Sequence, residues 1–191
     1  MILNRVELYL CGILPLLLLV VLSAPAVALD NIYLVRHAEK VDFWPPGPAD
    51  DKLDAFHPLS CAGLKRADAL ADRLKAAGIV AIYTSHTTRT LATGAPLANA
   101  THVTIKADDA SIHPDKMSGF LEPLRQMEGH AVLIVGHSNT IPELLVRLGA
   151  KSDCFQRLGI TGQPGSLLIE GYEGFWKVDL KKQGCEAISR E

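Results

Sequence analysis

Three short apolar segments, each ending directly in polar residues, restrict the fold of this chain more than any other feature. They span residues 31–35, 79–84 and 131–135, and their β-branched and aromatic side chains are typical of buried strands. Segments with helical periodicity lie between them. This alternation predicts an α/β fold, a three-layer α/β/α arrangement around a mostly parallel sheet.

The residues that follow these segments are chemically reactive or charged. The first segment ends in Arg36 and His37, the second is followed by Ser85 and, inside the next helix, Arg89, and the third ends in Gly136 and His137. In open α/β sheets, ligands bind beyond the carboxyl ends of the strands. We therefore expect two arginines and two histidines to meet at one edge of the sheet.

The remaining elements follow from helix caps, apolar stripes and turn residues. Ser60 can cap a helix whose stripe is Leu64, Ala67, Leu70, Ala71 and Leu74, and Gly78 ends it. Two final strands, joined by a tight turn at residues 171–174, predict a C-terminal antiparallel hairpin. The predicted helices cover about residues 60–77, 87–99, 114–127 and 141–148, and the predicted further strands cover residues 102–105, 166–170 and 175–180.

The first 28 residues have the organisation of a secretory signal peptide. Arg5 precedes an apolar stretch at residues 8–22, and Ala26 and Ala28 form an Ala-x-Ala pattern for cleavage before Leu29. An uncleaved N-terminal anchor is the alternative. We expect residues 1–28 to be the signal peptide and residues 29–191 to form one domain of an exported protein, periplasmic or secreted.

Composition excludes some classes of partner and leaves a disulfide possible. Lys and Arg number 19 against 21 Asp and Glu, so no basic excess indicates nucleic-acid binding. The mature part holds Cys61, Cys154 and Cys185. Cys154 and Cys185 are the candidates for a bridge, and Cys61 is expected to be a small buried residue opening a helix. None has a spacing typical of a zinc site, so no metal is predicted.

Four segments, in order, resemble the histidine phosphatase superfamily, the phosphoglycerate mutase-like proteins. They are Arg36-His37-Ala38-Glu39, the helix opening at residues 58–67, Ser85 with Arg89 and Thr93, and Gly136-His137. The resemblance implies the phosphoglycerate mutase-like fold. It also implies hydrolysis of phosphomonoesters through a phosphohistidine, without metal or other cofactor.

The resemblance assigns roles to individual residues. His37 is the implied nucleophile, Arg36 and Arg89 bind phosphoryl oxygens, and His137 donates to the transferring group. The cations near His37 are expected to push its pKa below the usual value of about 6.5 and keep it neutral. The family's general acid corresponds to Asp108 or the adjacent Asp109, with Asp108 favoured slightly over its neighbour.

Three further residues are candidates for contacts around the substrate. Glu39 belongs to the opening motif and is expected near the histidine as a supporting contact. Ser85 can bond a phosphate oxygen or only shape a turn, and His86 can line the pocket or lie at the surface. Two solvated loop carboxylates are the plain alternative for the aspartates.

The expected partner is a small-molecule or cell-envelope phosphate ester, with membrane contact only through the signal segment. Oligomeric state is left open. The first alternative is a module that binds phosphate groups without hydrolysing them, because the sequence does not identify the general acid with certainty. Mutase activity is less favoured because the chain is short, and a metal-dependent hydrolase using His37, His86 and His137 conflicts with two arginines at the same place.

Overall fold

The computed structural model describes residues 28–41 and 55–191. The predicted signal peptide and the loop at residues 42–54 lie outside the described residues. Within the described part, no helix is both long and apolar enough to cross a bilayer.

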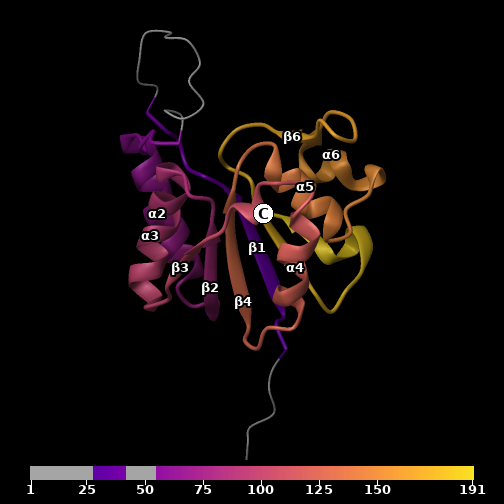
Figure 1. Cartoon of the computed structure of the whole chain (residues 1–191), viewed down its shortest axis with the longest axis horizontal. Helices are drawn as coiled ribbons and strands as arrows, with labels where there is room; N and C mark the ends of the chain where they lie inside the picture. The colour runs from indigo at the N-terminus through magenta and orange to yellow at the C-terminus, as the bar shows by residue number, and fades with distance from the viewer. Residues whose placement is uncertain (1–27, 42–54) are drawn as a thin grey trace, which may run out of the picture.

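A six-stranded sheet forms the centre of the fold, in the order β3-β2-β4-β1-β7-β8 (Figure 1). The first four of these strands run parallel, and β7 and β8 add antiparallel pairing at the β1 side. The strands are β1 (Asn31–Arg36), β2 (Ile79–Thr84), β3 (Ile105–Ala107), β4 (Ala131–Gly136), β7 (Phe175–Asp179) and β8 (Ile188–Arg190). A separate small sheet pairs β5 (Ile160–Thr161) with β6 (Leu168–Ile169).

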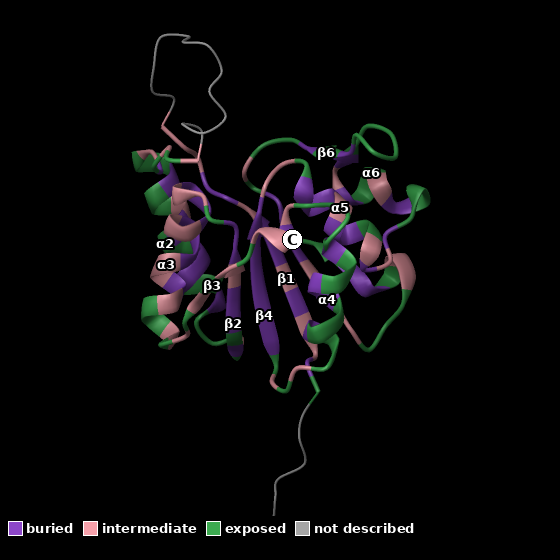
Figure 2. Cartoon of the chain, viewed as in Figure 1, coloured by how far each residue is buried: buried purple, intermediate pink, exposed green. Residues whose placement is uncertain are grey.

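Helices cover both faces of the sheet and complete the predicted three layers. One face packs against α2 (Cys61–Leu74) and α3 (Thr88–Thr101). The other packs against α4 (Met117–Arg125), α5 (Thr140–Arg147) and α6 (Phe155–Leu158). Short 3₁₀ turns span η1 (Asp109–Ser111), η2 (Ser152–Cys154) and η3 (Gly184–Ala187). Strand β4 is buried along its whole length (Figure 2), as expected for a central parallel strand.

Helix α2 begins where its sequence predicts. The Ser60 hydroxyl accepts a hydrogen bond from the backbone N–H of Gly63 at 3.1 Å, which satisfies one donor of the first turn. Leu64, expected in the apolar stripe, is exposed instead. Gly63 takes the inward position, because its missing side chain lets the helix lie directly on the Glu39 carbonyl. This contact brings α2 against the residues that follow β1.

Two predicted boundaries shift by several residues. The short strand expected at residues 102–105 is β3, which begins only at Ile105, because His102 has a left-handed conformation (φ 56°) and ends α3. Helix α4 starts at Met117 rather than near Pro114. The chain at residues 113–116 forms a turn in which Met117 N–H bonds the His113 carbonyl.

The predicted C-terminal hairpin is correct in its antiparallel character and wrong in its strand partners. Residues 166–170 and 175–180 do not pair with each other. Strand β6 pairs with β5, while β7 inserts between β1 and β8. Burial decides this arrangement, since pairing with β1 places Phe175, Trp176 and Val178 in the core.

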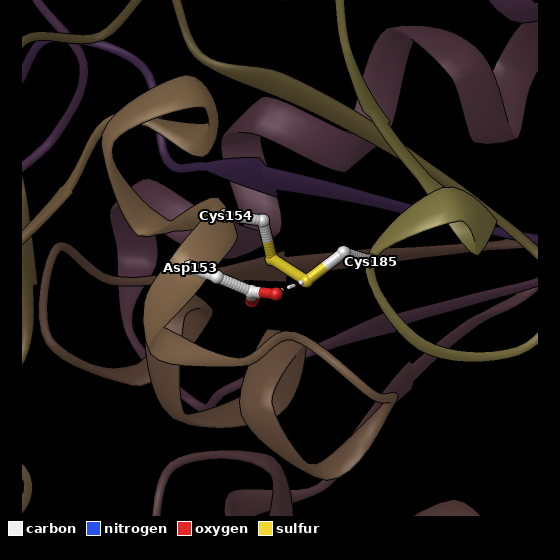
Figure 3. A group of neighbouring side chains, drawn as sticks. All are labelled: Asp153, Cys154 and Cys185. Atoms are coloured by element: carbon white, nitrogen blue, oxygen red, sulfur yellow. Dashed lines mark hydrogen bonds between the residues drawn. A yellow bond between two sulfur atoms is a disulfide. The ribbon is translucent and has the colours of Figure 1, made fainter.

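Cys154 and Cys185 form the expected disulfide, with 5.9 Å between their Cα atoms (Figure 3). The disulfide joins η2 to η3, and its two cysteines lie 31 residues apart in the sequence. Asp153 Oδ1 lies 3.1 Å from the Cys185 sulfur. Because both sulfurs are bonded to each other, this trio does not offer thiolate ligands to a metal. Cys61 is free and exposed, so the expectation that it is buried is wrong.

Candidate active site

The register of the parallel strands brings the two site histidines together. Arg36 pairs with Gly136 at the ends of β1 and β4, and the His37 N–H continues the ladder by donating to the Gly136 carbonyl at 2.9 Å. His37 and His137 therefore follow neighbouring strand ends. Their rings lie edge to face with centroids 5.3 Å apart.

A pocket of about 390 Å³ opens above these strand ends. Four residues predicted for catalysis line it: Arg36, His37, Arg89 and His137. Its other lining residues are Lys40, Thr87, Ile112, Ser138, Asn139 and Thr140. The lining thus carries three permanent cations and no carboxylate among the described residues. Such a lining favours an anion with several oxygens over a metal cation.

The buried imidazole of His37 is held in one tautomer. Its Nδ1 lies 2.8 Å from the carbonyl oxygen of Ala38. A carbonyl can only accept, so Nδ1 carries the proton and Nε2 keeps an unshared electron pair. The Ala38 backbone is fixed in turn, because its N–H donates to the Thr93 hydroxyl at 2.9 Å, and that hydroxyl donates to the Arg89 carbonyl.

Burial lowers the pKa of His37 to about 4. The loss of solvation is the largest cause, and the positive charges of Arg89, Arg36 and Lys40 add to it, while the bond to the Ala38 carbonyl acts in the opposite direction. The lowered pKa expected from the sequence has the right sign, although burial outweighs the cations. At neutral pH the ring is uncharged.

This shift predicts a pH dependence of stability. The unfolded chain takes up a proton at this histidine near pH 6.5, whereas the folded chain resists protonation until about pH 4. Stability from this residue is complete above pH 6.5 and falls by roughly 2 to 3 kcal/mol on acidification to pH 4.5. Urea unfolding of the wild type and of His37→Asn, above pH 6.5 and at pH 4.5, measures this loss of stability. We expect a smaller acid loss in the variant, and an equal loss in both would contradict the shift.

His137 is positioned by side chains from two other elements. Its Nε2 lies 2.9 Å from the Ser85 hydroxyl, and its Nδ1 lies 3.4 Å from Arg89 Nη2. A guanidinium only donates, so in the neutral ring Nε2 carries the proton toward Ser85. The backbone N–H of His137 donates to the Thr140 hydroxyl at 2.8 Å. Asn139 occupies the N-cap of α5 and makes no side-chain cap bond.

A family model for the histidine phosphatase superfamily (branch 1) matches residues 32–111, the part that carries Arg36, His37 and Arg89. Over this part, which is less than half of its length, the chain is similar to the histidine phosphatase superfamily. No curated protein matches it.

Solved structures of several phosphatases share the fold at low identity. A protein histidine phosphatase SixA complexed with tungstate has 13% identity and a TM-score of 0.59, covering 84% of this chain and 94% of its own. A chain named as a phosphohistidine phosphatase, SixA from Agrobacterium tumefaciens, has 21% identity and a TM-score of 0.57, covering 78% and 91%. Mycobacterial glucosyl-3-phosphoglycerate phosphatase has 15% identity and a TM-score of 0.56, covering 85% and 96%.

The three residues considered for substrate contacts, Glu39, Ser85 and His86, do not line this pocket. The Glu39 carboxylate binds the Arg66 guanidinium through contacts of 2.6 to 3.0 Å. This ion pair is the main cause that lowers the pKa of Glu39. Ser85 bonds His137, and the exposed ring of His86 bonds Asp109 at 3.0 Å. Glu39 and Ser85 thus support the histidine segments, and their contacts to substrate stay predictions.

The two aspartates considered as the general acid are engaged in local contacts. Asp108 Oδ1 accepts the Ala110 N–H at 2.8 Å and so caps η1. Asp109 accepts from the His86 backbone N–H at 3.0 Å. The balance of burial against the contacts with His86 leaves the pKa of Asp109 below its usual value. Neither is in the pocket lining. The structure shows Asp108 as the N-cap of η1, and its role as general acid stays a prediction.

Sequence reasoning missed the lining residues Lys40, Thr87 and Ile112, and it also missed Tyr172, which lies beside Arg36. Tyr172 belongs to the segment predicted as a hairpin turn, yet its ring lies 4.1 Å from the Arg36 guanidinium carbon and 5.9 Å from the His37 ring. No motif marks this residue, and 135 positions separate it from His37. The sequence predicts a turn at residues 171–174, which indicates that the chain reverses direction there. It does not indicate which residues the turn contacts.

Proposed function

We propose that the protein is a phosphatase that hydrolyses phosphomonoesters through a phosphohistidine on His37. The observation that carries this proposal is the bond from His37 Nδ1–H to the Ala38 carbonyl, which leaves the Nε2 electron pair unshared in a ring that borders a cationic pocket. Tungstate in the SixA complex and inorganic phosphate in the mycobacterial phosphatase complex support oxyanion binding on this fold.

The proposed reaction has two displacements at phosphorus. The Nε2 pair of His37 attacks the phosphoryl group, the P–O ester bond breaks, and its electrons leave with the alkoxide or aryloxide, which takes up a proton. Water then attacks the phosphohistidine, the P–N bond breaks, and its electrons return to Nε2. The guanidiniums of Arg36 and Arg89 offset the charge of the phosphoryl oxygens in both steps, and His137 donates a hydrogen bond to the transferring group when its Nε2–H leaves Ser85.

The pocket lining favours substrates whose leaving group needs little protonation. No carboxylate lines it among the described residues. We therefore propose a preference for aryl or acyl phosphates, whose leaving groups are stable anions, and for phosphoramidates, whose basic nitrogen can take up its proton from solution before the P–N bond breaks, over alkyl phosphates. The same observation supports the second candidate, a module that binds phosphate groups without turnover.

We also propose that the protein is exported and works on small-molecule or cell-envelope phosphates. The support is the signal-type organisation of residues 1–28 together with the Cys154–Cys185 disulfide, since disulfides persist mainly in oxidising compartments. Metal independence is proposed from the cationic lining, which would repel a divalent ion.

Hydrolysis of an aryl phosphate by residues 29–191 in chelator, followed by acid-quench mass spectrometry, tests the proposal. Turnover with a phosphate on His37 is the expected result. Tungstate binding without turnover and without label would favour the binding module. Turnover that chelator abolishes would contradict metal independence.

A further inference from the structure

We infer that Tyr172, with the adjacent Gly171 carbonyl, is the positioning residue for Arg36, holding its guanidinium where the transferring phosphoryl group binds. The inference rests on the proposed function, because it assigns Arg36 an oxyanion to bind. It gives a role to the segment between β6 and β7, which the sequence marks only as a turn.

Arg36 is held by two contacts from this segment. Its Nη1 donates to the Gly171 carbonyl at 2.9 Å, and its guanidinium carbon lies 4.1 Å from the centroid of the Tyr172 ring. Gly171 has φ 69°, a left-handed conformation that glycine adopts without strain. The carbonyl and the ring thus come from consecutive residues of one turn.

Among the described residues, the Arg36 side chain makes no hydrogen bond other than the one to the Gly171 carbonyl. Its Nε is buried and has no hydrogen-bond partner among the described residues. A long, flexible side chain without such contacts would have to be ordered by the substrate at each binding event. Contacts made before the substrate arrives reduce this cost and fix the direction of the remaining N–H donors.

The turn is also tied to the segment that carries the nucleophile. Glu173 Oε1 lies 3.4 Å from Arg66 Nη2, and Arg66 binds Glu39 through its Nε and Nη2. The contacts therefore form a closed path from Arg36 through the turn to Arg66 and back to Glu39, three residues after Arg36. The exposed Glu173 contact is the weakest member, so the ring and carbonyl contacts are the ones to test.

The Tyr172 ring further borders the nucleophile, since its centroid lies 5.9 Å from that of His37. The guanidinium of Arg36 lies over the ring itself. A cation in this position is attracted by the π-face, which phenylalanine presents as tyrosine does. Phenylalanine should therefore replace tyrosine at this position.

Titration of tungstate into residues 29–191 by calorimetry tests the inference without requiring turnover. We expect Tyr172→Leu to weaken tungstate binding about three- to thirtyfold, the range expected for losing a cation–π contact. Tyr172→Phe should stay within about twofold of wild type, because it keeps the ring face. Tyr172→Leu in an Arg36→Met background should add no further loss, since the group it positions is gone.

Thermal unfolding of each variant separates positioning from a general loss of structure. Equal tungstate affinity in Tyr172→Leu and wild type would overturn the inference and leave the proposed function intact. A similar loss in Tyr172→Phe, or a full additional loss in the Arg36→Met background, would overturn it as well. Absence of tungstate binding by the wild type would count against the proposed function itself and the inference with it.

Discussion

His37→Asn is expected to lower the kcat/KM for an aryl phosphate by at least about 10⁴-fold and to eliminate the phosphate label on the protein. The physical reason is specific to one atom. The proposed reaction needs the electron pair that His37 Nε2 retains because Nδ1–H is committed to the Ala38 carbonyl. An asparagine amide nitrogen has no comparable basic pair to attack phosphorus.

The measurement compares steady-state rates and acid-quenched label for wild type, His37→Asn and a matched control. His130→Asn is that control, because His130 is exposed and lies at the amino end of β4, whereas His37 and His137 follow the carboxyl ends of their strands. The control should keep wild-type turnover. Wild-type turnover in His37→Asn would require another nucleophile and would end the phosphohistidine proposal.

Arg89→Met is expected to lower kcat/KM by about 10²- to 10³-fold, comparable to removing one preorganised donor to a developing anion. Arg89 is 7% exposed in the first turn of α3, so its charge acts in a site that excludes much of the water. Methionine keeps much of the length of the side chain and removes the charge. Tungstate affinity should fall together with the rate, because the same donors bind both anions.

The pH dependence of Arg89→Met provides a second readout. The Arg89 charge contributes, after burial, to the low pKa of His37. Without that charge the pKa of His37 should rise from about 4 toward its usual value. The acid limb of kcat/KM should therefore move to higher pH in the variant.

Two control variants test whether an Arg89→Met loss is specific to the pocket and to the guanidinium. Arg125→Met, on α4, removes an exposed arginine away from the pocket and should leave kcat/KM unchanged. Arg89→Lys keeps the charge but loses the forked donor geometry, so an intermediate loss is expected. A wild-type rate in Arg89→Met would exclude this arginine from phosphoryl binding.

Export and the choice of substrate lead to experiments of a different kind. A fusion of residues 1–28 to a reporter would follow transport, and a panel of aryl, acyl and alkyl phosphates would rank leaving groups.

The sequence by itself determined the elements whose signals are local. The apolar segments at residues 31–35, 79–84 and 131–135 became β1, β2 and β4 because a run of apolar side chains gains most when buried on both faces of a parallel sheet. The Ser60 cap fixed the start of α2, since a hydroxyl bonds its own chain three residues later. The sequence also identified Cys154 and Cys185 as the candidates for the disulfide.

The sequence could predict those residues of the candidate site that directly follow the ends of strands. Arg36, His37 and His137 follow parallel neighbouring strands, and the register of such strands places their ends together without further information. Arg89 joins them because β2 delivers the start of α3 to the same edge. Sequence and family resemblance therefore sufficed for the centre of the pocket, while the chemical roles there stay predictions for the kinetic experiments.

Only the tertiary structure decided which distant segments support that centre. Strand β7 pairs with β1 and not with β6, the strand that precedes it in the sequence. This pairing places Tyr172, just before β7, against Arg36. Local propensity cannot select between antiparallel partners for β7, because β6, β1 and β8 offer similar backbone hydrogen bonds and differ in the apolar area that pairing buries. For the same reason the Glu39–Arg66 pair and the capping contact of Asp108 became visible only once the packing of α2 and η1 fixed which groups lie within bonding distance.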